Sequence, residues 1–395
     1  MEMSGKNVLI IGKGISGEGA RDAATALGAQ AVITETADVP PEAEKADLIV
    51  VSPSVKPCHP IFAYAVLHGK PLVGEIGLGA MINTKPVIGV TGTNGKTTVV
   101  EMLGAVYREA GIKAAVCGNI GISFSRTAVH GNYDCVILEL SSFQLLNAAP
   151  LHCHIACITN IDEDHIDYHG SFFEYKRAKL AICARQTSRD FFIKRSTDDY
   201  FIKTDAAVAD AHAVDYEIKA RGLHNKLNAG FAAAVARLDG ISEGVIRRAL
   251  ENFEPSSYRI ALSAEINGTK FFNDSKGTNI SATIAAARTV SGSSALIVGG
   301  SDKGGSFEKL FDGLPENITC VFVIGQTADR IMCAARLRGF SRTVKCSGLA
   351  DAVCKAANGG FSNVLFSPAC ASFDEYRNYA ERGEAFDSIV KGLIN

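Results

Sequence analysis

The sequence lacks the features that mark a membrane protein or a nucleic-acid-binding protein. It contains no apolar run approaching the roughly 20 residues that a helix needs to span a bilayer. Its 40 basic and 42 acidic side chains leave a formal charge of −2, so neither sign of charge dominates. The chain therefore has no excess of positive charge with which to bind nucleic acid or an anionic membrane. We expect a soluble, cytoplasmic protein with neither of these partners.

The 11 cysteines include no Cys-x-x-Cys pair, which would be the most specific signal for a zinc site. The nearest approach to a metal cluster is Cys153, His154 and Cys157. These residues lie in an apolar run that is typical of a buried strand. We therefore expect reduced cysteines in a hydrophobic core.

The length and composition predict several globular domains. A chain of 395 residues, 47% hydrophobic and 21% charged, is long enough for two or three domains with separate cores. Strand-like and helix-like segments alternate throughout, which predicts an α/β fold with mostly parallel sheets. Breaks near residues 84 and 255 predict domains at 1–84, 85–255 and 256–395. We expect the first and third to be Rossmann-like, and the chain to be a monomer.

Residues 87–98 predict a strand, a phosphate-binding loop and the start of a helix. The β-branched strand is followed by Gly92 and Gly95, which permit tight backbone angles. Lys96 can then reach the β- and γ-phosphates of ATP or GTP, and the Thr97 hydroxyl can hold Mg²⁺. The strict motif has glycine where this chain has Val90, so an ordinary strand-to-helix turn is the alternative. The predicted ATP-binding residues of this loop are Gly92, Thr93, Asn94, Gly95, Lys96, Thr97 and Thr98.

Two polar groups follow predicted strands at the same sheet edge. Glu139 follows the strand at residues 134–138, where a carboxylate beside a phosphate loop can bind Mg²⁺. His165 follows the strand at residues 155–158 and is a candidate ligand for a second metal or for substrate. The alternatives are a solvent-facing strand end for Glu139 and an ordinary solvated acidic loop around His165.

Two later segments carry structural expectations. Residues 172–185 predict an amphipathic helix on which periodicity places Lys176, Arg177 and Lys179 at the surface. Residues 191–218 alternate in short pieces and predict small antiparallel strands.

A dinucleotide fingerprint near the start supplies the main rival interpretation. Gly12, Gly14 and Gly17 follow a strand at residues 7–11, and the acidic Glu35 stands about 20 residues further on. This pattern is typical of an NAD-dependent dehydrogenase. A nucleotide-bearing substrate can occupy the same turn.

Seven motifs, in order along nearly the whole chain, resemble the Mur ligases. Within that family, Ser-Ser-Phe-Gln and Ser-Pro-Ala-Cys-Ala-Ser resemble the members that add D-glutamate to UDP-N-acetylmuramoyl-L-alanine. A Mur-type ligase for another amino acid stays open, because only these motifs argue for D-glutamate. The seven motifs are Thr91-Gly92-Thr93-Asn94-Gly95-Lys96-Thr97, Gly118-Asn119-Ile120-Gly121, Glu139-Leu140-Ser141-Ser142-Phe143-Gln144, Asp164-His165, His224-Asn225, Asp274-Ser275-Lys276 and Ser367-Pro368-Ala369-Cys370-Ala371-Ser372.

The resemblance implies an activity and its cofactors. The N-terminal domain would bind the UDP-substrate, the central domain ATP, and the C-terminal domain the amino acid. ATP would convert the alanyl carboxylate to an acyl phosphate, which the amine of D-glutamate would attack to form an amide. Two Mg²⁺ ions are implied, the first on Thr97 and Glu139 and the second on His165. Lys179 matches the family's carbamylated lysine, a metal-binding anion.

The resemblance also assigns the remaining candidate residues by position. Lys96, His165 and Lys179 would be catalytic. Asn225, Arg259, Asp274 and Lys276 would contact the nucleotide. The UDP-substrate would contact Gly14, Ile15, Ser16, Asn119 and Gln144, and D-glutamate would contact Thr278, Lys303, Ser367 and Phe373.

Overall fold

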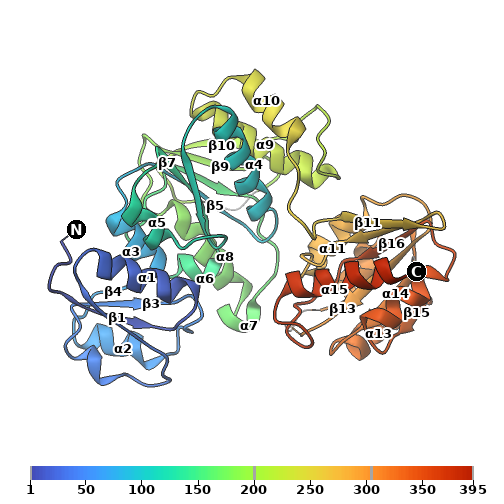
Figure 1. Cartoon of the computed structure of the whole chain (residues 1–395), viewed down its shortest axis with the longest axis horizontal. Helices are drawn as coiled ribbons and strands as arrows, with labels where there is room; N and C mark the ends of the chain where they lie inside the picture. The colour runs from blue at the N-terminus through green and yellow to red at the C-terminus, as the bar shows by residue number, and fades with distance from the viewer. Residues whose placement is uncertain (1, 199–201, 303–305, 394–395) are drawn as a thin grey trace. The chain divides into compact units, whose positions relative to one another are not determined.

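The computed structural model describes residues 2–198, 202–302 and 306–393 of the chain, which forms two compact units (Figure 1). The α/β prediction is confirmed, because the three sheets are parallel except for one edge strand. The first unit comprises Met1–Ile161, Tyr168–Ile218 and Leu227–Phe253, and the second comprises Asp162–Asp167, Lys219–Lys226 and Glu254–Asn395.

A four-stranded parallel sheet opens the first unit, in the order β2-β1-β3-β4. The strands β1 and β3 are short β-branched runs that are buried on both faces, as a parallel sheet covered by helices requires. The elements of this part are β1 (Asn7–Ile11), α1 (Ile15–Ala26), β2 (Gln30–Thr34), η1 (Pro41–Ala43), β3 (Leu48–Val51), α2 (Pro60–Leu67), β4 (Leu72–Gly74) and α3 (Glu75–Ile82).

The second sheet of this unit has six strands in the order β10-β9-β8-β5-β7-β6. The strand β5 lies in its interior between β7 and β8, so the segment after it opens at the carboxyl edge of the sheet. The strands are β5 (Val87–Thr91), β6 (Ala114–Gly118), β7 (Cys135–Glu139), β8 (Ile155–Ile158), β9 (Phe191–Arg195) and β10 (Ala207–Ala211). The helices are α4 (Lys96–Glu109), α5 (Phe124–His130), α6 (Ser142–Leu145), α7 (Ile166–His169), α8 (Phe172–Leu180), η2 (Ala181–Cys183), α9 (Leu223–Leu238) and α10 (Glu243–Asn252).

The prediction of small antiparallel strands at residues 191–218 was wrong. Strands β9 and β10 pair in parallel, and β9 continues the sheet from β8. The connection between them is long enough to cross over and return in the same direction, whereas an antiparallel pair needs only a short turn.

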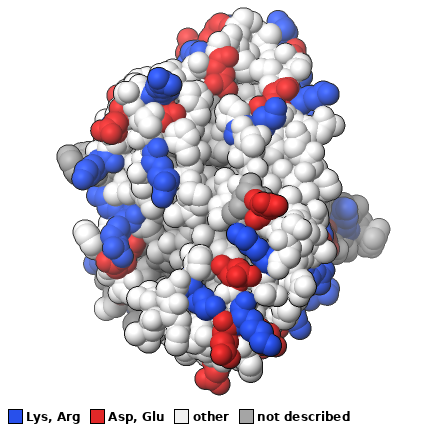
Figure 2. Space-filling model, turned by 90° about the vertical axis from the view of Figure 1, so that its left-hand side faces the viewer, with Lys and Arg blue, Asp and Glu red and all other residues white. Residues whose placement is uncertain are grey.

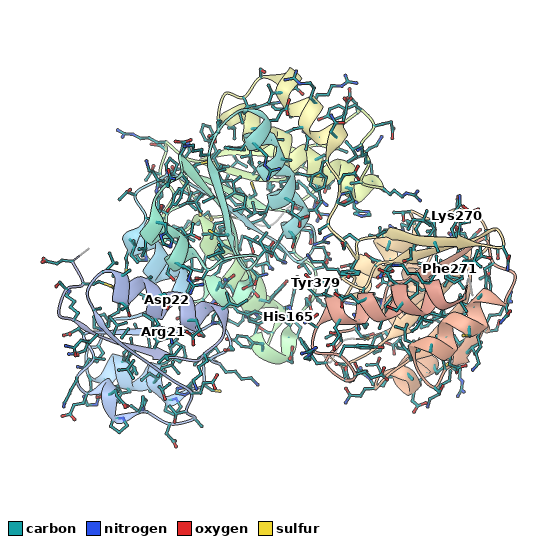
Figure 3. All side chains as sticks on the ribbon, viewed as in Figure 1. Arg21, Asp22, His165, Lys270, Phe271 and Tyr379 are labelled. Carbon is teal, nitrogen blue, oxygen red and sulfur yellow. The ribbon has the colours of Figure 1, made fainter. Side chains whose placement is uncertain are left out.

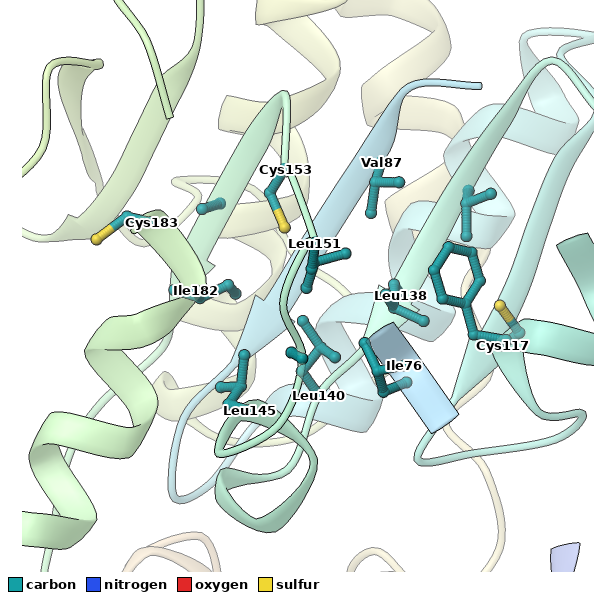
Figure 4. Packing of buried hydrophobic residues seen from close by; sticks show 14 of the residues in the cluster. Ile76, Val87, Cys117, Leu138, Leu140, Leu145, Leu151, Cys153, Ile182 and Cys183 are labelled. Carbon is teal, nitrogen blue, oxygen red and sulfur yellow. The ribbon is translucent and has the colours of Figure 1, made fainter. Parts of the chain in front are cut away.

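The core of this region explains the cysteines. Cys153 is fully buried in a cluster with Val87, Leu138 and Ile182 (Figure 4). The cysteines in the described residues are free thiols, and burial raises the pKa of Cys153 to about 12. Eight of the 11 are buried and fill space as small apolar groups, as expected, whereas Cys58, Cys333 and Cys354 are exposed.

The helix α3 connects the two sheets of the first unit. The Glu75 carboxylate at its first turn accepts hydrogen bonds at Oε1 from Ser125 N and Oγ, at 2.6 and 2.7 Å. Burial raises the pKa of Glu75, against the lowering effect of these bonds. Ile76, on the same helix, belongs to the core cluster of the six-stranded sheet.

The second unit contains a six-stranded sheet in the order β11-β12-β16-β13-β14-β15, in which β11 is antiparallel. Adjacent parallel strands β12, β16 and β13 bring three strand ends to one edge. The elements are β11 (Ala261–Ile266), β12 (Thr269–Asn273), α11 (Ile280–Ala287), β13 (Ser294–Gly299), α12 (Glu308–Gly313), β14 (Ile318–Ile324), α13 (Ala328–Leu337), β15 (Thr343–Lys345), α14 (Leu349–Ala357), β16 (Asn363–Phe366) and α15 (Tyr379–Gly392).

Charges of both signs are mixed on the surface. Figure 2 shows Lys and Arg side chains interspersed with Asp and Glu over the face in view. Among the described helices, none has the length and apolar character needed to cross a bilayer.

Candidate active site

The loop between β5 and α4 has a backbone that only glycine accommodates at two positions. Gly92 has a φ of 150°, and a Cβ there would lie 1.9 Å from Thr159 Oγ1. Gly95 has a φ of 85° and precedes α4, where a Cβ would lie 2.5 Å from Asn228 Oδ1. The absence of glycine at Val90 matters little, because Val90 is a buried residue of β5.

Side chains from the end of β8 hold the loop in place. Asn160 Oδ1 accepts from Asn94 N at 2.9 Å, and Asn160 Nδ2 donates to Asn94 O at 2.9 Å. Thr159 Oγ1 also donates to Asn94 O, at 2.5 Å. The sequence analysis did not assign these two residues, although their place directly after a buried strand was a usable signal.

Two lysines converge on one carbonyl of this loop. Lys96 Nζ donates to Gly92 O at 2.7 Å and to Thr93 O at 2.9 Å. Lys179 Nζ also donates to Gly92 O, at 2.7 Å. Two amines from separate helices are therefore neighbours at the predicted phosphate site.

The periodicity-based placement of Lys179 at the surface was wrong. Its side chain is 1% exposed, and its Nζ lies 4.7 Å from the centre of the Tyr175 ring. The buried side of α8 comprises Tyr175, Ala178 and Lys179, which share one helix face. Arg177 is exposed and Lys176 is partly exposed, as periodicity predicts.

Glu139 ends β7 as a buried carboxylate that is 1% exposed. Its Oε1 accepts from Asn119 Nδ2 at 2.8 Å. Its Oε2 is buried and has no hydrogen-bond partner among the residues that the structure describes. The alternative of a solvent-facing strand end is therefore wrong. Thr97 is buried in the first turn of α4.

His165 belongs to the second compact unit, whereas Lys96, Thr97, Glu139 and Lys179 belong to the first. It precedes α7 in a left-handed conformation, with a φ of 54° (Figure 3). Its backbone N donates to Asp164 Oδ1 at 2.9 Å, and its Nε2 lies 3.6 Å from Asp164 Oδ2. Its role as a metal ligand stays a prediction.

The predicted UDP-substrate residues lie in different parts of the first unit. Gln144 lines a shallow hollow, together with Ser52, Glu75, Asn147 and Tyr168. Its Oε1 accepts from Ser141 N at 2.9 Å in a capping box that starts α6. Asn119 binds Glu139 instead, while Gly14, Ile15 and Ser16 form the turn between β1 and α1.

In the second unit, the predicted nucleotide residues Asp274 and Arg259 interact, and Ser367, predicted for D-glutamate, bonds to Asp274. Ser367 Oγ donates to Asp274 Oδ2 at 2.7 Å. Burial raises the pKa of Asp274 to about 7, although hydrogen bonds from Ser367 and Ile260 and the charge of Arg259 oppose this shift. Burial and the charge of Arg259 lower the pKa of His224 to about 4. Asn225, the next residue, is buried and donates from Nδ2 to Arg221 O at 2.7 Å.

The predicted amino-acid residues differ in exposure. Ser367 is fully buried, whereas Phe373 is 74% exposed. Thr278 lies in the loop before α11 and donates from its backbone N to Lys276 O at 3.0 Å. Lys276 Nζ lies 5.2 Å from the centre of the Tyr379 ring. Lys303 lies outside the described residues.

Comparison with known proteins shows which family the chain is related to. The Mur ligase middle domain matches residues 90–237. A protein of Streptococcus pneumoniae (strain P1031) named UDP-N-acetylmuramoylalanine--D-glutamate ligase is 35% identical over 380 residues, covering 89% of this chain and 84% of that protein. A protein of the same name from Geotalea uraniireducens (strain Rf4) is 32% identical over 451 residues, covering 100% of this chain and 99% of that protein.

Solved structures support the same fold at lower sequence identity. UDP-N-acetylmuramate-alanine ligase MurC from Thermotoga maritima is 18% identical, with a TM-score of 0.62 and coverage of 98% of this chain and 100% of that chain. MurF ligase from Thermotoga maritima in complex with ADP is 15% identical, with a TM-score of 0.61 and coverage of 99% and 96%.

The parallel α/β fold with a glycine-dependent turn before α4 is typical of nucleotide-binding enzymes, and the relatives at 32–35% identity show the ligase class. The chain belongs to the Mur ligase family. This membership decides against the dehydrogenase interpretation of the Gly12 turn.

Proposed function

We propose that the chain is an ATP-dependent ligase that joins D-glutamate to the alanyl carboxylate of UDP-N-acetylmuramoyl-L-alanine, in peptidoglycan precursor synthesis. The relatives at 32–35% identity carry the name of this activity. The observation that carries the proposal is the convergence of Lys96 and Lys179 on Gly92 O. Transfer of the γ-phosphoryl group to a carboxylate brings two negatively charged groups together. Cationic side chains beside them would stabilise the transition state.

Carbamylation of Lys179 would remove a positive charge from this part of the loop. Lys96 and Lys179 donate to one acceptor, and Lys179 is almost completely buried, where a positive charge is costly. A carbamate on Nζ replaces that cation with an anion. The resulting oxygens would attract Lys96 and could bind Mg²⁺.

The residues at the sheet edge suit magnesium. Glu139 Oε2 is a buried carboxylate oxygen without a hydrogen-bond partner in the described part of the chain, and such oxygens are preferred Mg²⁺ ligands. Thr97 would supply its hydroxyl, and His165 would be a ligand of a second ion. Bound Mg²⁺ would shield the γ-phosphate from the incoming carboxylate.

The reaction would proceed in two balanced steps. An oxygen of the alanyl carboxylate attacks the γ-phosphorus, and the bond to ADP breaks, leaving an acyl phosphate. The neutral amine of D-glutamate then attacks the acyl carbon, phosphate leaves, and the nitrogen loses a proton to give the amide. Lys96 would stabilise the transferring phosphoryl group by hydrogen bonding.

The other substrate contacts follow the predicted domains at 1–84, 85–255 and 256–395. Gln144 and the hollow beside it would hold the UDP-substrate with Asn119 and the Gly14–Ser16 turn. The two carboxylates of D-glutamate need cationic and hydroxyl donors, which Lys303, Thr278 and Ser367 would provide. Asn225, Arg259, Asp274 and Lys276 would contact ATP.

The test is phosphate release from Mg-ATP and UDP-N-acetylmuramoyl-L-alanine, with D-glutamate, L-glutamate, L-lysine or no amino acid. Release that depends on D-glutamate supports the proposal. Release with a different amino acid keeps the ligase and changes its specificity. An absence of turnover under all four conditions, together with NADH binding, would overturn it.

A further inference from the structure

Arg382 is the largest fully buried side chain of the described residues, and the reaction scheme above does not use it. It lies in the first turn of α15, one turn after Tyr379, which is labelled at the helix start in Figure 3. A cation in the first turn of a helix is disfavoured by the helix dipole. No carboxylate of the described chain forms a salt bridge with it. A buried arginine in this environment requires strong compensating contacts.

Those contacts are backbone and hydroxyl oxygens from two strand ends. Towards the end of β12, Nη2 donates to Ser275 O at 3.0 Å and Nε to Ser275 Oγ at 3.2 Å. Towards the end of β16, Nη1 donates to Ala371 O at 2.9 Å and Nη2 to Cys370 O at 3.1 Å. The guanidinium also lies 5.8 Å from the centre of the Phe366 ring.

The segment after a third strand, β13, also lies next to the Arg382 side chain. Ser301 N, after β13, donates to Ala371 O at 2.9 Å, which is the oxygen that Arg382 also binds. A Cβ on Gly300 would lie 3.0 Å from Arg382 Nη1, so the backbone passes directly over the guanidinium. Arg382 therefore contacts the ends of all three adjacent strands β12, β16 and β13.

The two loops that it bonds both carry residues predicted to contact the incoming amino acid. The loop at residues 274–279 carries Thr278 beside the nucleotide residues Asp274 and Lys276, and the loop at residues 367–373 carries Ser367 and Phe373. We propose that Arg382 is a positioning residue that fixes these two loops relative to each other and thereby sets the affinity for the incoming amino acid. This inference rests on the proposed function, because that function assigns the ligands to the loops.

Lysine cannot reproduce this arrangement. The planar guanidinium presents donors in fixed directions to both loops at once, whereas an ammonium on a flexible stem bonds as a point charge. Burial lowers the pKa of Arg382 to about 10, so it stays protonated at neutral pH. Arg382→Lys therefore keeps the charge and removes the fixed geometry.

The experiment compares Arg382→Lys and Arg382→Met with two controls in the full chain. Arg377→Ala removes an exposed arginine that pairs with Glu381 near the same helix start. Val353→Ala removes two buried methyl groups from α14 in the core of the same sheet, and so supplies a loss of stability without removing any hydrogen bond to the two loops. If Arg382→Met does not fold, Arg382→Lys carries the test.

The first readout is the KM for D-glutamate at saturating ATP and UDP-substrate. We expect Arg382→Lys to raise it roughly tenfold or more, because small displacements of positioning groups have large effects. We expect Val353→Ala to lower thermal stability and leave this KM unchanged. An unchanged KM in Arg382→Lys would overturn the proposal.

The second readout is amide hydrogen exchange of the ligand-free chain, which does not depend on the proposed function. Exchange that accelerates in residues 274–279 and 367–376, while α13 stays protected, supports the positioning role. Acceleration throughout the sheet, or at neither loop, would overturn it. If the wild-type chain does not use D-glutamate, the proposed function fails, and the exchange pattern still decides the role of Arg382.

Discussion

Lys179 Nζ donates a hydrogen bond of 2.7 Å to Gly92 O, which joins helix α8 to the phosphate loop. Lys96 Nζ reaches the same oxygen from helix α4. This relationship brings Lys179 next to the loop between β5 and α4 through its position in the fold, independently of any motif. It also explains why a lysine can be buried there.

Lys179→Ala should lose ligase activity by at least about 100-fold, because it removes an electrostatic group beside the transferring phosphoryl group. Short carboxylates such as formate or acetate should restore part of the activity, since they can occupy the space of the carbamate. The measurement is phosphate release with and without added carboxylate.

Arg177→Ala is the matched control for that experiment, because Arg177 lies on the exposed side of the same helix and pairs with Glu174. It should retain activity and show no response to carboxylates. A fully active Lys179→Ala enzyme would show that no carbamate is needed.

Lys96→Ala should lose substrate-dependent ATP turnover by at least about 100-fold while the fold stays intact. Lys96 Nζ would donate hydrogen bonds to the γ-phosphoryl group while it moves to the carboxylate, and alanine has no such donor. Turnover and the thermal unfolding midpoint check these two statements separately. Lys113→Ala, which removes an exposed lysine directly before β6 of the same sheet, should behave as wild type. Retained turnover in Lys96→Ala would remove the phosphate-loop assignment.

Glu139→Gln should raise the Mg²⁺ concentration for half-maximal activity by at least about tenfold. Glutamine keeps an oxygen that can accept from Asn119, so the local fold is preserved while the anionic ligand is lost. A Mg²⁺ titration of initial rates measures the effect. The same half-saturating concentration in both proteins would argue against a metal at Glu139 Oε2.

Asp274→Asn should stabilise the chain more at pH 8 than at pH 5.5. The pKa of Asp274 is raised from 3.8 to about 7, so the folded state binds its proton more tightly than the unfolded state. The free energy of unfolding of the wild-type protein therefore falls as pH rises through 7. The loss is about 2 kcal/mol between pH 5.5 and pH 8. Asparagine does not titrate and can still accept from Ser367.

Denaturant-dependent amide exchange in β12 and β16 at the two pH values measures this difference for the second unit. The free energy of opening in Asp274→Asn minus that in wild type should grow with pH. An equal difference at pH 5.5 and pH 8 would contradict the raised pKa.

The sequence was sufficient for the alternation of strands and helices, the glycine-dependent turn between β5 and α4, and the class of fold. These features depend on short-range signals, such as the β-branched run before Gly92 and the glycines that its backbone requires. The parallel pairing of β9 and β10 could not be predicted in this way. Strand direction depends on the path of the connecting chain, which periodicity does not report.

Buried cations were the second class of feature that periodicity could not predict. Lys179 and Arg382 both look like surface residues in sequence, since an isolated charge usually faces solvent. Their burial depends on carbonyl oxygens from segments far away in the chain, at Gly92 and at Cys370 and Ala371. Family motifs indicated Lys179, whereas Arg382 emerged only from the contacts of the folded chain.

The most direct test of the account is the transfer of oxygen from substrate to phosphate. UDP-N-acetylmuramoyl-L-alanine labelled with ¹⁸O in its alanyl carboxylate is incubated with Mg-ATP, D-glutamate and the protein, and the released phosphate is analysed by mass spectrometry. An acyl-phosphate intermediate predicts that each phosphate carries one oxygen from the carboxylate. Phosphate that contains no substrate oxygen, although amide is formed, would contradict the account.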